Sequence, residues 1–248
     1  MKNRSNLPES RNATNAPGAS LSLHGRVIDD EVYSERKVSS FVAVASQFRR
    51  CQFANMAIEQ ACFGGGTADS IYSSCTFDGS NIRAIAPGCA RFVRCSFRDV
   101  VLHEFYCTAV EFVDCIFSGT IRHAFFNGTV PISDQLHVGR IRNEFTGNDF
   151  SNADLIDVAF RTGIDLSNQK LPLGSDYLYL PSAADSIRSA EAVVSQWEPE
   201  ARRKALVVLD VFARETVGGQ SDLLLRLVNL PLSLRPEGRR IFELLRGK

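Results

Sequence analysis

The amino-acid sequence predicts a mainly β protein: a solenoid with a square coil, followed by an α-helical segment. Hydrophobic residues recur every five positions over much of the chain, similar stretches recur twenty residues apart, and the spacing becomes helical after Ser182. A period of five matches neither the 3.6 of a helix nor the 2 of a flat strand. It suits a chain that turns a corner every five residues and completes a square coil after twenty.

The twenty-residue repeat is clearest between residues 92–97 and residues 112–117, where every apolar position has a counterpart. Residues 72–77 form a fainter copy. A fixed internal period of this kind is typical of repeat proteins, in which each repeat forms one structural unit of a stack.

The five-residue register predicts which side chains point into the solenoid. Its three runs are Leu23, Ile28, Tyr33, Val38, Ala43, Phe48, Phe53, Ile58, Phe63; then Tyr72, Phe77, Ile82, Pro87, Phe92, Phe97, Leu102, Cys107, Phe112, Phe117; then Phe145, Phe150, Leu155, Phe160. Every position except Pro87 is hydrophobic, against 44% of the whole chain. Two positions earlier the residue is often small, which suits a narrow interior. These small residues are Ser46, Cys51, Ala61, Ser70, Cys75, Ser80, Ala90, Cys95, Cys115 and Ala153.

These features resemble the pentapeptide-repeat proteins, whose motif has a small residue, then Asp or Asn, then Leu or Phe, then two polar residues. The best match is residues 148–157, and the resemblance covers residues 21–166. It implies a right-handed quadrilateral β-helix. Residues twenty apart would then stack about 4.8 Å from each other in parallel sheets. Opposite charges share this spacing in the pairs Arg91 with Glu111, Arg94 with Asp114, and Asp78 with Arg98.

The pattern divides the chain into three parts. Residues 1–20 are polar and are predicted to form a disordered or loosely attached arm. Residues 21–181 form the β-helix, in which the glycines at 64–66 shift the register by four and Arg122 falls on an inward position. We therefore expect an irregular insertion over residues 118–144. Residues 182–248 form a helical tail.

Within the tail, Pro199 suits the first turn of one helix and Pro236 opens the last, while residues 223–230 are predicted to form a short apolar helix. Residues 167–181 are predicted to be an exit strand. Helices this apolar must bury their apolar faces. Three surfaces could cover these faces: the open end of the β-helix, a second copy of the chain, or another protein.

Two columns of residues are candidates for a disulfide or a metal site. Cys75, Cys95 and Cys115 would stack within reach of a disulfide, but a straight column does not make a tetrahedral metal site, and we interpret them as packing residues. His103 and His123, with Arg83, would form an exposed column that no carboxylate cluster completes as a metal site. We predict no catalytic, cofactor-binding or metal-ligating residue, no cofactor, and no enzymatic activity.

The composition of the chain limits the classes of partner that we expect it to bind. Basic and acidic residues both number 28, so no global charge favours nucleic acid or an anionic membrane surface. The chain has no run of eighteen apolar residues that would span a membrane. Seven cysteines, most at small or inward positions, are predicted to be reduced, in a cytoplasmic protein.

The function predicted from these features is a non-catalytic protein–protein interaction module. A rigid β-helix is its platform, the partner is a protein of unknown identity, and the C-terminal helices are a docking or homodimerisation element. The alternative comes from the family resemblance: some pentapeptide-repeat proteins mimic DNA and inhibit or protect DNA gyrase. Residues 38–170 carry 13 acidic and 11 basic residues, which is a poor imitation of a phosphate backbone.

Overall fold

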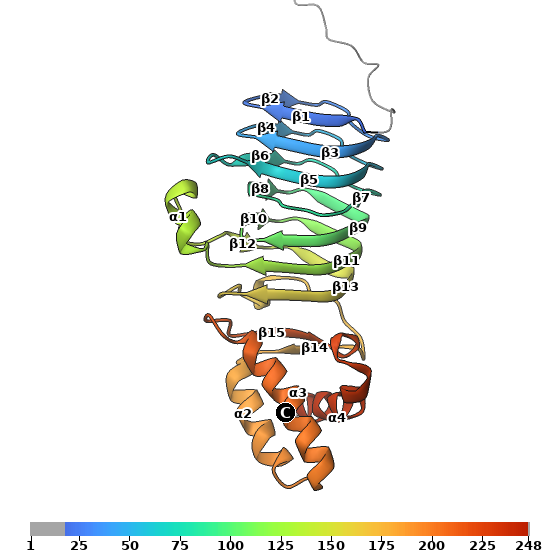
Figure 1. Ribbon diagram of the computed structural model, residues 1–248, viewed down its shortest axis with the longest axis vertical. Helices are drawn as coiled ribbons and strands as arrows, with labels where there is room; N and C mark the ends of the chain where they lie inside the picture. Colours follow the sequence, from blue (N-terminus) through green and yellow to red (C-terminus); the bar gives the residue numbers. More distant parts are fainter. Residues whose placement is uncertain (1–17, 248) are drawn as a thin grey trace, which may run out of the picture.

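The computed structural model describes residues 18–247, so most of the predicted N-terminal arm lies outside the described residues. A tall β-solenoid carries a helical tail at its C-terminal end (Figure 1). One parallel sheet has the order β1-β3-β5-β7-β9-β11-β13 and a second has the order β12-β10-β8-β6-β4-β2. The first sheet contains β1 (Ser20–His24), β3 (Lys37–Val44), β5 (Ala57–Gly65), β7 (Asn81–Ile82), β9 (Ser96–Cys107), β11 (Ile116–Asn127) and β13 (Asp149–Arg161). The second contains β2 (Val27–Asp29), β4 (Gln47–Arg49), β6 (Ser70–Ser73), β8 (Cys89–Val93), β10 (Ala109–Val113) and β12 (Phe145–Thr146).

This arrangement confirms the predicted fold class, a quadrilateral β-helix followed by helices. Strands stack in parallel with the twenty-residue register, so Phe92 pairs with Phe112 and Arg91 with Glu111. Because the five-residue pattern repeats, each coil has the same shape as the one before and stacks on it. Backbone hydrogen bonds between the parallel strands of successive coils stabilise the stack.

The corners explain the five-residue step. Arg94, Asp99 and Glu104 are five residues apart and all have left-handed backbone, with φ of 53°, 53° and 57°. The same conformation recurs at Asn55 and Gly79. Glycine and Asn adopt positive φ most readily, while other residues do so at a small cost. Each such residue turns the chain onto the next side, two positions after an inward side chain.

The interior is a set of stacked rings. Phe53, Phe77, Phe97 and Phe117 stack in sequence, with neighbouring ring centroids 5.0, 4.7 and 5.0 Å apart. Of the predicted inward positions only Leu23 and Tyr33, in the first coil, are partly exposed. All the predicted small residues are buried as well. The inward register is therefore confirmed for the rest of the solenoid.

The glycine insert shifts the register as predicted. Phe41 pairs with Ala61, twenty residues on, whereas Phe48 pairs with Tyr72, twenty-four residues on. Gly64 bridges Gly88 of the next coil, and a Cβ on Gly64 would lie 1.9 Å from the Cys89 carbonyl oxygen. Only a residue without a side chain allows the two backbones to approach this closely.

The prediction of an irregular insertion over residues 118–144 is wrong in its first part. β11 continues to Asn127, and its register slips by one residue at Gly119, which pairs with Val100. The slip brings Ile121 into the interior in place of Arg122, which lies outside. The excursion is confined to the residues after β11 and contains helix α1 (Ile132–Val138).

The tail differs from the prediction at residues 223–230. These residues form strand β15 (Leu223–Arg226) and the 3₁₀ turn η2 (Leu227–Asn229), because Leu223 to Arg226 pair antiparallel with β14 (Tyr177–Leu180). The predicted exit strand thus pairs with the tail and not with a coil. The other elements are η1 (Leu166–Asn168), α2 (Ala183–Val194), α3 (Pro199–Glu215), η3 (Leu232–Leu234) and α4 (Arg235–Arg246).

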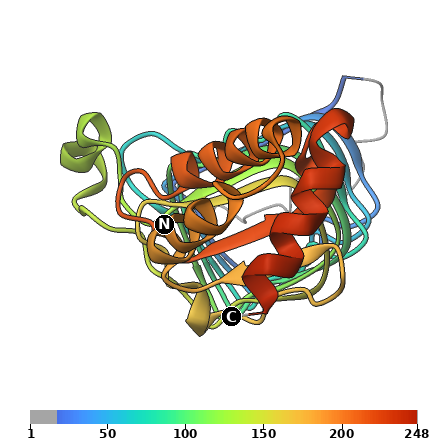
Figure 2. The ribbon, with the colours of Figure 1, turned by 90° about the horizontal axis from the view of Figure 1, so that it is seen from below.

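The tail lies across the end of the solenoid (Figure 2), which is the first of the three options considered for it. It has a core of its own, separate from the solenoid core, built from α2, α3, α4, β14 and β15. Polar contacts join the two: Arg226 pairs with Asp154 at 2.7 Å, and the Tyr177 hydroxyl accepts from the Leu155 N–H at 2.9 Å.

Candidate functional site

The cysteine column consists of packing residues. Cys75, Cys95 and Cys115 are free and buried, and the Cys95 thiol donates to the Tyr72 carbonyl oxygen at 3.3 Å. Burial raises the pKa of the Cys95 thiol well above its ordinary value. The Cys95 thiol is therefore a poor nucleophile and a poor metal ligand.

The histidine column is only partly as predicted. Because of the slip at Gly119, it is Arg122 that pairs with His103 in the sheet. The rings of His103 and His123 nevertheless lie edge to face, 5.2 Å apart, and His123 Nδ1 is 2.8 Å from a carboxylate oxygen of Asp157. Within residues 18–247, no group of three or more His, Cys, Asp or Glu side chains is placed to hold a metal ion.

Several acidic side chains on the solenoid are paired with basic ones along the stack. Arg50 hydrogen-bonds to Asp30 through both oxygens at 2.7 Å, which lowers the pKa of that carboxyl. Arg91 bridges Glu111 and Glu144, each at 2.6 Å. The predicted pair of Asp78 with Arg98 is present at 3.8 Å. Among the described residues, Glu31, Glu35, Glu59, Asp99, Asp114 and Asp165 are not in such an ion pair, so the pairing compensates part of the negative charge and not all of it.

The predicted pair of Arg94 with Asp114 is absent from the ion pairs of the described residues. Both residues are corner residues, with φ of 53° and 54°. Twenty-residue spacing therefore places two side chains in one column without fixing the direction in which each points.

One side of the solenoid carries no charge over most of its height, and we call it the uncharged face. It consists of the outward residues beside the inward Ala43, Phe63, Pro87, Cys107, Phe126 and Phe160. They are Val42, Val44, Cys62, Ala86, Tyr106, Thr108, Phe125, Asn127 and Ala159. Tyr106 stacks on Phe125 at 5.2 Å, and the Arg161 guanidinium, the first charge met, lies 5.1 Å from the Phe125 ring.

Beside this face, α1 projects from the solenoid at the end of β11 (Figure 1). Arg140 ties the excursion down through Asp69 at 2.8 Å and the Ala109 carbonyl oxygen at 2.7 Å. The helix itself exposes Ile132 by 86% and Leu136 by 94%, four residues apart on one side. A helix that is anchored yet exposes its apolar residues is typical of a contact surface.

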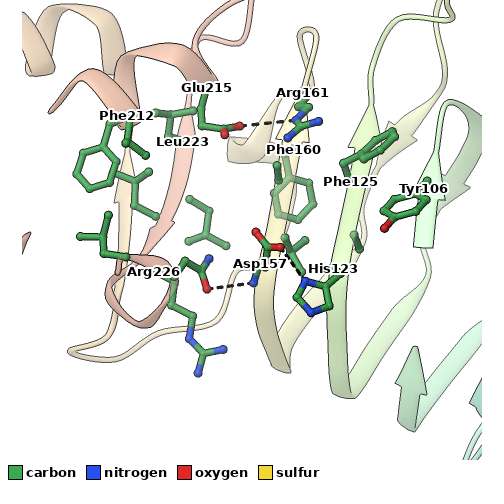
Figure 3. A pocket seen from close by; sticks show the side chains of 18 residues that line it. Tyr106, His123, Phe125, Asp157, Phe160, Arg161, Phe212, Glu215, Leu223 and Arg226 are labelled. Atoms are coloured by element: carbon green, nitrogen blue, oxygen red, sulfur yellow. Dashed lines mark hydrogen bonds and ion pairs between the residues drawn. The ribbon is translucent and has the colours of Figure 1, made fainter. Parts of the chain in front are cut away.

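A cavity of about 340 Å³ lies where the uncharged face meets the tail (Figure 3). The Arg161–Glu215 ion pair, at 3.7 Å, closes one end of it, and the hydrogen bond from the Asp157 N–H to Asn229, at 3.0 Å, closes the other. Its walls are the edge strand β13 on one side and α3 with β15 on the other. Sequence reasoning missed this cavity because it forms between segments more than fifty residues apart.

The uncharged face, by contrast, was readable from the sequence. The residues on either side of the inward positions of this side lack charge from Val42 to Ala159.

Square coils with a five-residue period and a left-handed corner residue make this solenoid a quadrilateral β-helix, the fold implied by the resemblance to pentapeptide-repeat proteins. No family model matches the chain, and no curated protein matches it. Among solved structures, two trypsin-treated variants of QnrB1, described as a plasmid-mediated fluoroquinolone resistance protein, are similar to it. One is 14% identical with a TM-score of 0.31 and covers 60% of this chain and 79% of its own. The other is 18% identical with a TM-score of 0.30 and covers 61% and 78%.

Likeness at this level carries no inference about function. The function must be argued from the surfaces of this chain. Within the described part of the chain, no helix is long and apolar enough to cross a membrane.

Proposed function

We propose that this chain is a non-catalytic protein–protein interaction module, with the solenoid as a rigid platform. The observation that carries the proposal is the uncharged face, flanked by α1 with its exposed Ile132 and Leu136. Apolar side chains gathered on a rigid surface and bordered by charged residues are typical of protein-binding surfaces. The expected setting is the cytoplasm, which agrees with seven free cysteines.

The helical tail contributes to the proposal in a more limited way than the sequence predicted. Its main apolar stripe is buried in its own core, including Leu209 at 0% exposure. Leu206 and Val207 of α3 remain exposed by 41% and 46%. Docking or homodimerisation through the helices would therefore involve this smaller outer stripe.

The alternative, a DNA mimic that binds gyrase, finds less support in the distribution of charge. A DNA-like rod needs a continuous acidic surface. Here Asp30, Glu111 and Glu144 are each paired with an arginine, and the uncharged face offers no phosphate-like groups. An interaction module of a different specificity is the better proposal.

A double substitution in α1 tests the proposed function. Ile132→Asp with Leu136→Asp should reduce capture of the partner about tenfold or more, because it places charge in an apolar contact while leaving the solenoid core untouched. The measurement is an affinity capture with the full-length tagged chain, quantified by mass spectrometry. The melting temperature should stay close to that of the original chain.

The matched control is Ser133→Asp with His137→Asp, which adds the same charge at the same spacing on neighbouring exposed positions. Proteins captured equally by both double variants would count against α1 as the contact. Gyrase subunits captured by every variant, with inhibition of supercoiling by the purified chain, would favour the alternative.

A further inference from the structure

The last coil of the solenoid has a hydrogen-bonding edge that must be satisfied by something other than a further coil. In the stack, the N–H of each inward aromatic residue donates to the coil that follows. Examples are Phe53 to the Thr76 oxygen and Phe77 to the Ser96 oxygen, both at 2.7 Å. At the end of the stack these groups face the tail, and unpaired backbone groups at a strand edge invite pairing with another chain.

Segments that follow the last coil contribute a hydrogen bond to each of three of its four sides. On the first side the paired N–H is that of the corner residue Gly147, not of the inward Phe145, and it donates to the Asn168 oxygen at 3.1 Å. On the second, the Phe150 N–H donates to the Lys170 oxygen at 2.7 Å. On the third, the Leu155 N–H donates to the Tyr177 hydroxyl at 2.9 Å.

The fourth side, which is the end of the uncharged face, is left open. Its inward residue is Phe160, which pairs with Phe126 of β11 on the far edge of the strand. Among residues 18–247 no hydrogen bond joins the Phe160 N–H to the tail, and no strand pairs with β13 on its tail-facing edge. The nearest N–H groups that are paired with the tail lie at the two ends of this side. The Asp157 N–H donates to the Asn229 side chain and the Gly163 N–H to the Gln220 side chain, both at 3.0 Å.

The cavity described above opens onto this edge. The five consecutive residues of β13 from Asp157 to Arg161 line it, as do all four residues of β15. In the sheets formed by the described residues, β15 pairs only with β14, so its second edge is also free. Two strand edges thus line one cavity, together with Val211 and Phe212 of α3.

We propose that this edge binds an extended segment of a partner protein, which adds to β13 as one further strand. The inference rests on the proposed function and names the site and the form of the partner. The form is an extended segment because a strand edge hydrogen-bonds to another strand at about 4.8 Å, whereas a helix pairs its backbone groups internally. The interaction is β-augmentation: backbone hydrogen bonds bind the segment and pockets for alternate side chains select it.

The chemistry of the cavity defines the segment further. The walls supplied by Val158, Ala159 and Val211 are apolar. The polar side chains at the two ends already contact each other: Arg161 pairs with Glu215, and His123 shares a hydrogen bond with Asp157. The segment is therefore uncharged and apolar at the positions facing α3, and spans the three or four residues between two corners.

Amide hydrogen exchange in the free protein tests the edge itself. The Phe160 amide is expected to exchange at least about a hundredfold faster than those of Phe150 and Leu155 in the same coil, because these two are hydrogen-bonded to the tail. Nuclear magnetic resonance resolves the three amides individually. Equal protection of all three would mean that the edge is already closed, and would overturn the proposal.

Binding is tested with a peptide that copies residues 124–127, the uncharged segment that pairs with the opposite edge of β13. Added to the full-length chain at millimolar concentration, it should slow exchange of the Phe160 amide about tenfold or more. A peptide N-methylated at the position copying Phe125 should lose this effect, since the equivalent N–H of each coil donates to the preceding coil. No slowing by the unmodified peptide would overturn the proposal.

Val211→Trp provides the matched test on the protein, since it fills the cavity from the α3 wall. The control is Val193→Trp on α2, a valine of similar exposure (44%, against 39% for Val211) that does not line the cavity. We expect Val211→Trp to weaken peptide binding about tenfold and Val193→Trp to leave it unchanged. Equal effects of the two variants would contradict the proposed site.

The two proposals fail in different ways. A partner captured by Val211→Trp as well as by the original chain, but lost with the α1 double variant, would leave the interaction module intact and reject the strand-binding edge. A partner lost with Val211→Trp alone would support the edge and reject α1 as the contact.

Discussion

Replacing Phe97 with aspartate is expected to unfold the solenoid. The Phe97 side chain is 1% exposed and stacks between Phe77 at 4.7 Å and Phe117 at 5.0 Å. Loss of a buried phenylalanine costs about 3–5 kcal/mol, and an unpaired carboxylate in an apolar interior adds several more. That is comparable with the roughly 5–15 kcal/mol that stabilises a whole domain. The far-UV circular dichroism of the β-sheet should be lost at temperatures at which the original chain is folded.

The control for this experiment is Val101→Asp, four residues further along the same strand. Val101 is 45% exposed, so its replacement should change the free energy of unfolding by no more than about 1 kcal/mol. A melt of Phe97→Asp that matched that of Val101→Asp would show that the inward register is wrong.

Replacing Arg226 with alanine is expected to loosen the tail without unfolding the solenoid. The Arg226 side chain is 15% exposed and lies 2.7 Å from Asp154 and from Asp176. It also donates to the Leu155 carbonyl oxygen at 2.7 Å. Removing one partner of a buried pair costs about 3–5 kcal/mol, and we expect about 2 here because both carboxylates are partly exposed.

Hydrogen exchange locates this effect. The Leu155 amide, which is protected by Tyr177, should exchange about thirtyfold faster in Arg226→Ala, as a change of about 2 kcal/mol implies. Amides in the middle of β9 should keep their protection. Arg188→Ala is the comparison, because Arg188 is 73% exposed and pairs only with Asp185 among the described residues. A uniform loss of protection would mean that tail and solenoid unfold as one unit.

Much of the solenoid was predictable because its rule is local and repeated. Inward positions such as Phe92 and Phe112 follow from a five-residue spacing that recurs along the solenoid. The predicted inward positions are wrong only where the spacing between successive inward residues changes. At Gly119 one residue is missing, and Arg122 was placed inside while Ile121 takes that position. A one-residue slip has no signature of its own until strand pairing shows it.

The tail was harder to predict because its pairing is distant. Leu223 to Leu225 read as apolar in either a helix or a strand, and the choice is made by β14, more than forty residues earlier. For the same reason the sequence does not show which apolar residues of the predicted docking helices are buried, as Leu209 is. It is buried, because α3 packs against its own neighbours α2 and α4.

By itself the sequence determined the class of the fold, the inward side chains and the side of the solenoid that lacks charge. Each of these depends on residue type at a fixed local spacing, which a single chain displays in full. Only the tertiary structure decided how the last coil ends: three sides covered by following segments, and the fourth left open beside a cavity. That outcome depends on where α3 and β15 come to rest, and so on packing between segments whose separation in sequence carries no period.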